Sequence, residues 1–172
     1  MGKTKLQICN TKFLINGELT YSEYPDCPEE NRGLLMNARF IQGIFDDKAD
    51  ASRFERFGRH FDPEENTASL IAALPAWYAH GLRAFTVGFQ GGGPCFTMAD
   101  LQSIDNNPFS EDGMHIDRRY LDRMHRIIEA ADELGMVVIV SCFYGHQVRF
   151  LRDDIAVMEA VKSVSNWLRD QG

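Results

Sequence analysis

The feature that most constrains how this chain can fold is an apolar, strand-like run followed by a helix-like segment, which occurs three times. The three units cover residues 34–81, 83–135 and 136–172, and we treat them as one domain. Connections between parallel strands are right-handed, so the three helices are expected on one face of a parallel sheet. The other face would stay bare, because three strands cannot close a barrel of eight. The sequence therefore predicts an α/β fold of TIM-barrel type that is incomplete.

Local signals ahead of the first helix add detail to this pattern. Asn16 and Gly17 lie between two apolar runs and favour a type I′ turn, which predicts a hairpin over residues 12–21. Asp62 and Pro63 predict the start of a helix, with the aspartate as its cap and the proline in its first turn.

The helices are predicted from apolar residues that recur every three or four positions. Pro75 lies within the first helical pattern and is expected to kink that helix, because proline removes a backbone donor. In the second helix, Arg119, Arg123 and Arg126 fall opposite the apolar face and predict a solvated stripe. In the third helix, the residues expected to face the core are Ile155, Met158, Val161, Val164 and Leu168.

The charge balance limits the classes of partner. The chain has a net charge of −7, which disfavours nucleic acid and anionic membrane surfaces, because both attract basic patches. No apolar run approaches the length of a membrane span, and the start MGKTKLQICN lacks the apolar core of a signal peptide. The expected location is therefore cytoplasmic. The four cysteines are scattered without zinc spacing, which favours reduced thiols.

Polar residues gather where the predicted strands end. In parallel α/β folds, ligands bind at the carboxyl ends of the strands. A ligand rich in hydroxyl groups, such as a sugar, can form hydrogen bonds with amides, an aromatic hydroxyl and an imidazole at one shared edge. An aromatic ring at the same edge can also stack against it. The sequence therefore predicts a carbohydrate-binding edge that contains Asp46, Gln90, Tyr144, His146 and Gln147.

Several other chemistries lack their sequence motifs. FQGGGP is neither a Walker loop nor a dinucleotide fingerprint, because no helix follows it directly. His146 has no second ligand at metal spacing, and Asp46 and Asp47 are adjacent on an extended chain, so their side chains point opposite ways. No nucleophile elbow surrounds Ser141, and Cys95 has no identifiable base nearby. The sequence predicts neither a metal nor a cofactor and contains no catalytic constellation.

FLINGELTY is followed by GLLMNARFIQGIFDD, then by FDPEENTASLIAALPAWYAHGLRAFTVGFQGG, and later by YLDRMHRIIEAADELGMVVIVSCFYGHQ. Together these stretches, from Phe13 to Gly172, resemble the N-terminal part of cellulase-like glycoside hydrolase barrels. The resemblance implies two catalytic glutamates, at the ends of strands four and seven, and neither has a position in this chain. It also implies that the chain alone is inactive, and that Gly172 falls between a third helix and a fourth strand. On the same resemblance, Asn106 and Arg39 are further substrate-side candidates.

Two other interpretations stay open. A non-catalytic carbohydrate-binding or assembly module would cover the bare sheet with a second copy of the chain, or with a separately encoded remainder of a barrel. A complete small α/β domain of the flavodoxin-like type would instead need helices on both faces of its sheet. The expected partners are therefore a carbohydrate and either a second copy or a complementing C-terminal barrel portion.

Overall fold

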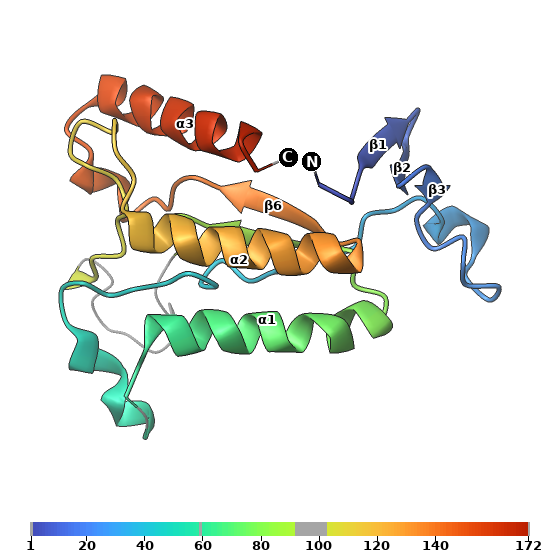
Figure 1. Cartoon of the computed structure of the whole chain (residues 1–172), viewed down its shortest axis with the longest axis horizontal. Helices are drawn as coiled ribbons and strands as arrows, with labels where there is room; N and C mark the ends of the chain where they lie inside the picture. The colour runs from blue at the N-terminus through green and yellow to red at the C-terminus, as the bar shows by residue number, and fades with distance from the viewer. Residues whose placement is uncertain (1, 59, 92–102, 172) are drawn as a thin grey trace.

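A parallel sheet with three helices against it forms the main body of the chain (Figure 1). The computed structural model describes residues 2–58, 60–91 and 103–171. The strand order is β4-β5-β6, and both pairings are parallel. The strands are β4 (Asn37–Arg39), β5 (Ala84–Gly88) and β6 (Val137–Ser141), and the helices are α1 (Pro63–Ala79), α2 (Arg118–Leu134) and α3 (Asp154–Arg169).

All three helices share one core with the central strand. Phe85 and Val87 of β5 pack in a single cluster with Leu74 of α1, Ile127 of α2 and Val164 of α3. Within the described residues, β4 and β6 each pair only with β5, so the sheet is open at both edges. The predicted mixed α/β class and the open parallel sheet are present. The eight-stranded TIM type stays a prediction.

The face of the sheet that points away from the helices is partly bare. Arg39, Thr86 and Ile139 lie in one row across the three strands. Arg39 is exposed and Ile139 is 39% exposed, whereas Phe85 in the adjacent, helix-facing row is fully buried. This asymmetry is the one expected when right-handed connections place every helix on the same side.

A separate antiparallel sheet precedes the parallel one. It consists of β1 (Leu6–Cys9), β2 (Lys12–Ile15) and β3 (Glu18–Leu19). The predicted hairpin is present between β2 and β3, and its two turn residues, Asn16 and Gly17, have φ values of 54° and 86°. Positive φ at both positions is what a type I′ turn requires. Strand β1 was not predicted.

The helix starts follow the sequence signals closely. The carboxylate of Asp62 accepts hydrogen bonds from the backbone N–H groups of Glu64 and Glu65, and Pro63 is the first residue of α1. Pro75 lies inside α1, which continues to Ala79 as one helix. Asp117 and Asp153 cap α2 and α3 in the same way as Asp62 caps α1.

The first strand of the parallel sheet and several short helical segments differ from the expectation. The first strand, expected to begin near residue 34, is shorter, because the chain turns after it with a bond from the Gly43 N–H to the Phe40 carbonyl. The polar stretch before α1 contains a 3₁₀ helix that the sequence did not indicate. In the described part of the chain, the 3₁₀ helices include η1 (Glu29–Asn31), η2 (Ala51–Phe57) and η4 (Val148–Phe150).

The prediction that Arg123 belongs to a solvated stripe is wrong. Its side chain is 2% exposed, because the first turn of α1 and the loop after β4 cover it and supply its carboxylate partners. Arg119 is exposed, as predicted, and Arg126 is 41% exposed.

The predicted core face of α3 is also partly wrong. Ile155, Met158 and Val161 are 62%, 54% and 40% exposed, while the small residues Ala156 and Ala160 are fully buried with Val164. The backbone of α3 at Ala156 and Ala160 lies against Gly113 of the loop before α2, and the larger side chains are exposed. None of the helices among the described residues combines the length and apolar character needed to cross a membrane.

Candidate functional site

Three buried amide side chains join the loops that follow the strands. Gln90, Asn106 and Gln147, all predicted as substrate-binding residues, are 1%, 0% and 2% exposed. The structure brings them together at the carboxyl end of the sheet. The backbone N–H of Asn106 donates to Gln147 Oε1 at 2.9 Å, and Gln90 Nε2 donates to the Gln147 carbonyl at 3.2 Å.

The amide of Gln90 connects the loop after β5 with the loop after β6. Its Nε2 also donates to Asn107 Oδ1 at 2.8 Å, and its Oε1 accepts from the backbone N–H of Tyr144 at 3.1 Å. Both donors of this side chain and its acceptor oxygen are therefore in use within the protein.

The amide of Asn106 extends the connection to the loop after β4 and to α2. Its Nδ2 donates to the carbonyl of Gly91 at 2.6 Å. Its Oδ1 accepts from the backbone N–H of Asp46 and from the hydroxyl of Tyr120, each at 2.9 Å. One side chain thereby fixes three separate segments of this end of the molecule.

The bonding of these amides changes the role expected for them. A buried polar network whose members are bonded to one another makes its surroundings rigid. Gln90, Asn106 and Gln147 could bond a sugar directly only by giving up bonds within the protein. Direct contact of these amides with a sugar stays a prediction. In this structure, they hold the loops in place.

Asp46 lies in a cluster of opposite charges below these loops. Its carboxylate is 3.4 Å from the guanidinium of Arg123, which also binds Glu64 at 2.9 Å. Arg126 binds the second oxygen of Glu64. The guanidinium of Arg123 lies 4.7 Å from the ring centre of Tyr120, and burial, with a smaller effect of Asp46, raises the pKa of the Tyr120 hydroxyl far above its ordinary value.

Asp47 faces different partners. Its side chain is fully buried and accepts from Arg53 Nε at 2.7 Å and from the backbone N–H of Asp105 at 3.1 Å. The prediction that Asp46 and Asp47 do not form a carboxylate pair is confirmed. A carboxylate that is committed to a cation and to backbone donors stabilises its loop and is poorly placed to exchange protons with a substrate.

Four candidates are at least partly exposed, among them Asp46, whose side chain is 17% exposed. His146 is exposed and Tyr144 is half-buried, and their ring centres lie 6.1 Å apart at an angle of 49°. Arg39 is also exposed, on the bare face of the sheet. Of the predicted residues, His146 and Arg39 are the most exposed.

Several residues of this end of the molecule were not singled out from the sequence. Asn107 accepts from Gln90, and its Nδ2 donates to the Phe109 carbonyl at 2.7 Å, but it lies in a loop without periodicity. Tyr120 was counted as part of an apolar face, and only its hydroxyl takes part in the network. A buried tyrosine beside an amide-rich loop is a signal that could have found it, because buried hydroxyls need partners.

The described residues contain no group of three or more His, Cys, Asp and Glu side chains placed to hold a metal ion. Cys95 and the second half of FQGGGP fall within residues 92–102, outside the described part of the chain.

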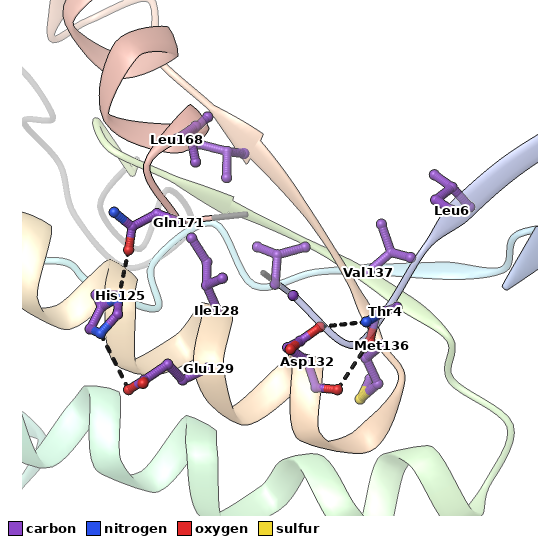
Figure 2. Close-up of a pocket in the computed structure, with 13 residues that line it drawn as sticks. Thr4, Leu6, His125, Ile128, Glu129, Asp132, Met136, Val137, Leu168 and Gln171 are labelled. Carbon is purple, nitrogen blue, oxygen red and sulfur yellow. Dashed lines mark hydrogen bonds and ion pairs between the residues drawn. The ribbon is translucent and has the colours of Figure 1, made fainter. Parts of the chain in front are cut away.

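A cavity of about 420 Å³ lies at a different place, between α2, the end of α3, β6 and the N-terminal segment (Figure 2). Its apolar walls include Ile128, Val138 and Leu168. On its polar side, His125 Nδ1 lies 2.6 Å from the side-chain oxygen of Gln171. None of the predicted site residues lines this cavity.

Comparison of the chain with models of protein families, with curated proteins and with solved structures gave no match.

Proposed function

We propose that the chain is the N-terminal portion of a (β/α)₈ barrel of the glycoside hydrolase type and that it carries part of the surface that binds a carbohydrate. The observation that carries this proposal is the order of the sheet. Three parallel strands lie side by side in chain order, with every helix on one face and a partly bare face opposite. That arrangement matches part of the wall of a (β/α)₈ barrel. Ligands of such barrels bind at the carboxyl ends of the strands.

The proposal divides the candidates into two roles. Tyr144 and His146 contact the sugar, the first by stacking its ring and the second by hydrogen bonding. Gln90, Asn106 and Gln147 are positioning residues, which hold the loops that present the two rings.

Hydrolysis is not part of the proposed function of the chain alone. Glycoside hydrolysis uses two carboxyl groups on opposite sides of the scissile bond, about 5 Å apart in retaining enzymes. The neighbouring acids Asp46 and Asp47 are bound to Arg123 and Arg53 and do not face each other.

Titration of the ¹⁵N-labelled chain with cellotetraose, xylotetraose and mannotetraose tests the proposal. We expect saturable shifts of the Tyr144 and His146 amides with at least one sugar. Tyr144→Ala should weaken binding at least about tenfold, which corresponds to about 1.4 kcal/mol. Tyr24→Ala is the matched control, because Tyr24 is also partly exposed but belongs to the N-terminal region.

Absence of saturable shifts with all three sugars at millimolar concentration would contradict carbohydrate binding by this surface. A reducing-end assay on the same samples should detect no hydrolysis. Release of new reducing ends by the pure chain would contradict the proposed loss of activity.

A further inference from the structure

Two asparagines occupy matched positions in the turns of the N-terminal antiparallel sheet. Asn10 lies in the two-residue turn between β1 and β2, and Asn16 lies in the two-residue turn between β2 and β3. Both have a φ of 54°, in the left-handed region, and both are exposed. They differ in the residue that follows, which is Thr11 after Asn10 and Gly17 after Asn16. The chain therefore contains its own comparison for the chemistry of an Asn-Gly turn.

Gly17 leaves its backbone nitrogen accessible. It is exposed, and apart from its chain neighbours no atom lies within 4 Å of the position where a Cβ would stand. Among the described contacts, its N–H has no hydrogen-bond partner. Glycine also has no side chain that could shield this nitrogen. An unbonded and unshielded backbone amide can act as the nucleophile toward the side-chain carbonyl carbon of the asparagine before it.

The side-chain carbonyl of Asn16 is fixed by a hydrogen bond. Its Oδ1 accepts from the backbone N–H of Lys5 at 2.7 Å, and the backbone N–H of Asn16 donates to the Lys5 carbonyl at 2.8 Å. An N–H at this distance stabilises the negative charge that develops on a carbonyl oxygen when its carbon is attacked. The Asn10 side chain has no such donor among the described contacts. The Asn-Gly turn therefore has both a nucleophile and a stabilising donor.

We propose that Asn16 is a site of spontaneous deamidation, in which the Gly17 nitrogen attacks Cγ of Asn16 while the Lys5 N–H stabilises Oδ1. The attack is intramolecular, which favours it strongly over attack by a separate molecule. A bond forms between the Gly17 nitrogen and Cγ, the Cγ–Nδ2 bond breaks, and the proton lost by Gly17 leaves with the ammonia. Water then opens the five-membered succinimide at either carbonyl and restores the Gly17 N–H. One water is consumed for one ammonia released, and nothing is oxidised or reduced.

The two products of ring opening act differently on the sheet. Aspartate keeps the original backbone and an oxygen that can accept from the Lys5 N–H. Isoaspartate adds a methylene group to the main chain, so the pairing of Ile15 with Glu18 and the two bonds to Lys5 lose their register. Lys5 follows Thr4, whose N–H and hydroxyl bind Asp132. We therefore expect isoaspartate to loosen the N-terminal segment where it meets α2. The site does not depend on carbohydrate binding.

Incubation of the full chain at physiological temperature and slightly alkaline pH, followed by trypsin digestion and mass spectrometry, tests the proposal. Trypsin separates the two asparagines into the peptides 6–12 and 13–32, and fragment ions distinguish Asn16 from Asn31 in the second peptide. We expect replacement of –NH₂ by –OH at Asn16 to be at least about tenfold faster than at Asn10. Protein isoaspartate methyltransferase with labelled S-adenosylmethionine should label the aged chain and should not label Asn16→Gln.

A variant of the first turn separates the effect of glycine from that of the Lys5 N–H. Thr11→Gly makes both turns Asn-Gly but gives only Asn16 the N–H donor. We expect Asn10 in this variant to react faster than in the unchanged chain but at least about threefold more slowly than Asn16. In the aged chain, the fraction of Lys5 amide that loses protection against hydrogen exchange should match the fraction of isoaspartate. Asn16→Asp should keep this protection, because its backbone is unchanged.

Equal rates at Asn16 and Asn10 in the unchanged chain would overturn the proposal. Equal rates at the two sites in Thr11→Gly would overturn the role of the Lys5 N–H. A Lys5 amide that stays fully protected in a chain containing isoaspartate would overturn the loosening of the N-terminal segment.

Discussion

At the scale of single residues, Asn106 links more segments than any predicted role suggested. Its side chain bonds to Gly91, to the Asp46 N–H and to the Tyr120 hydroxyl, and it is fully buried. Asn106→Ala would leave these partners buried without their bonds. A buried group left unsatisfied costs about 1–3 kcal/mol, so we expect a loss of about 2–4 kcal/mol in the free energy of unfolding.

Denaturant unfolding followed by circular dichroism would measure this loss. Asn166→Ala is the control, because Asn166 is exposed on α3 and bonds only to the flexible side chain of Arg169 among the described contacts. Its effect should stay within about 0.5 kcal/mol. Similar values for the two variants would mean that the Asn106 network does not stabilise the fold.

Arg123 is the second residue whose role only the structure defines. It is 2% exposed and binds both Asp46 and Glu64, whereas the neighbouring Arg126 is 41% exposed and binds Glu64 alone. Arg123→Met would remove a buried cation and leave two carboxylates close together. We expect it to destabilise the chain by about 2–4 kcal/mol, and Arg126→Met by less than about 1 kcal/mol.

Thermal unfolding of both methionine variants measures this difference directly. Equal melting temperatures would show that burial of Arg123 carries no stability of its own. The pair of residues also shows a limit of helical periodicity. The pattern of α2 places both arginines opposite its apolar residues, but it does not show that the loop after β4 and the start of α1 cover one of them.

At the scale of elements, signals carried by neighbouring residues were reliable and signals that depend on packing were not. Asp62, Pro63 and the Asn16-Gly17 turn were predicted because capping and turn geometry are local. The core face of α3 was predicted less well, because the buried residues are Ala156 and Ala160 and not the larger Ile155, Met158 and Val161. The candidate site follows the same rule. The strand ends were located from the sequence, but the burial of Gln90, Asn106 and Gln147 depends on how three distant loops meet.

Also at the scale of elements, the attachment of the N-terminal segment to α2 is expected to depend on pH. Burial raises the pKa of Asp132, but the N–H groups of Lys3 and Thr4 and the Thr4 hydroxyl lower it more, so that the pKa lies below its ordinary value. A lowered pKa means that the carboxylate stabilises the attached segment above the unfolded-state pKa of about 4, and that this stabilisation is lost as the pH falls through the folded-state pKa.

Hydrogen exchange of the Thr4 amide would follow this release. We expect the protection of the amide to be constant from about pH 7 to about pH 5, after correction for intrinsic exchange, and to fall below about pH 4. Asp132→Asn should lower the protection at neutral pH and remove most of the pH dependence. Protection that is unchanged at about pH 3 would show that the neutral carboxyl group holds the segment equally well.

At the scale of the whole molecule, the sheet class followed from the sequence because three apolar runs alternate with helices. Closure of the sheet could not be predicted in the same way, since it depends on what pairs with the outer edges of β4 and β6. The structure leaves both edges open within the described residues and leaves Ile139 39% exposed on the partly bare face. Exposed apolar sheet surfaces of this kind promote association.

A lysine at Ile139 should therefore reduce association without loss of the fold. The side chain of Ile139 points away from the helices, so a charged group there can stay in water, and we expect Ile139→Lys to change the free energy of unfolding by less than about 1 kcal/mol. Light scattering over a range of concentrations should show a smaller average mass than for the unchanged chain. Phe85→Lys is the contrasting variant, because Phe85 is fully buried against the helices and a lysine there should unfold the chain.

If Ile139→Lys folds but associates as strongly as the unchanged chain, the bare face is not the surface through which copies meet. Association would then have to use another exposed apolar surface, of which the outward face of α3, with Ile155, Met158 and Val161, is the largest helical example in the described chain.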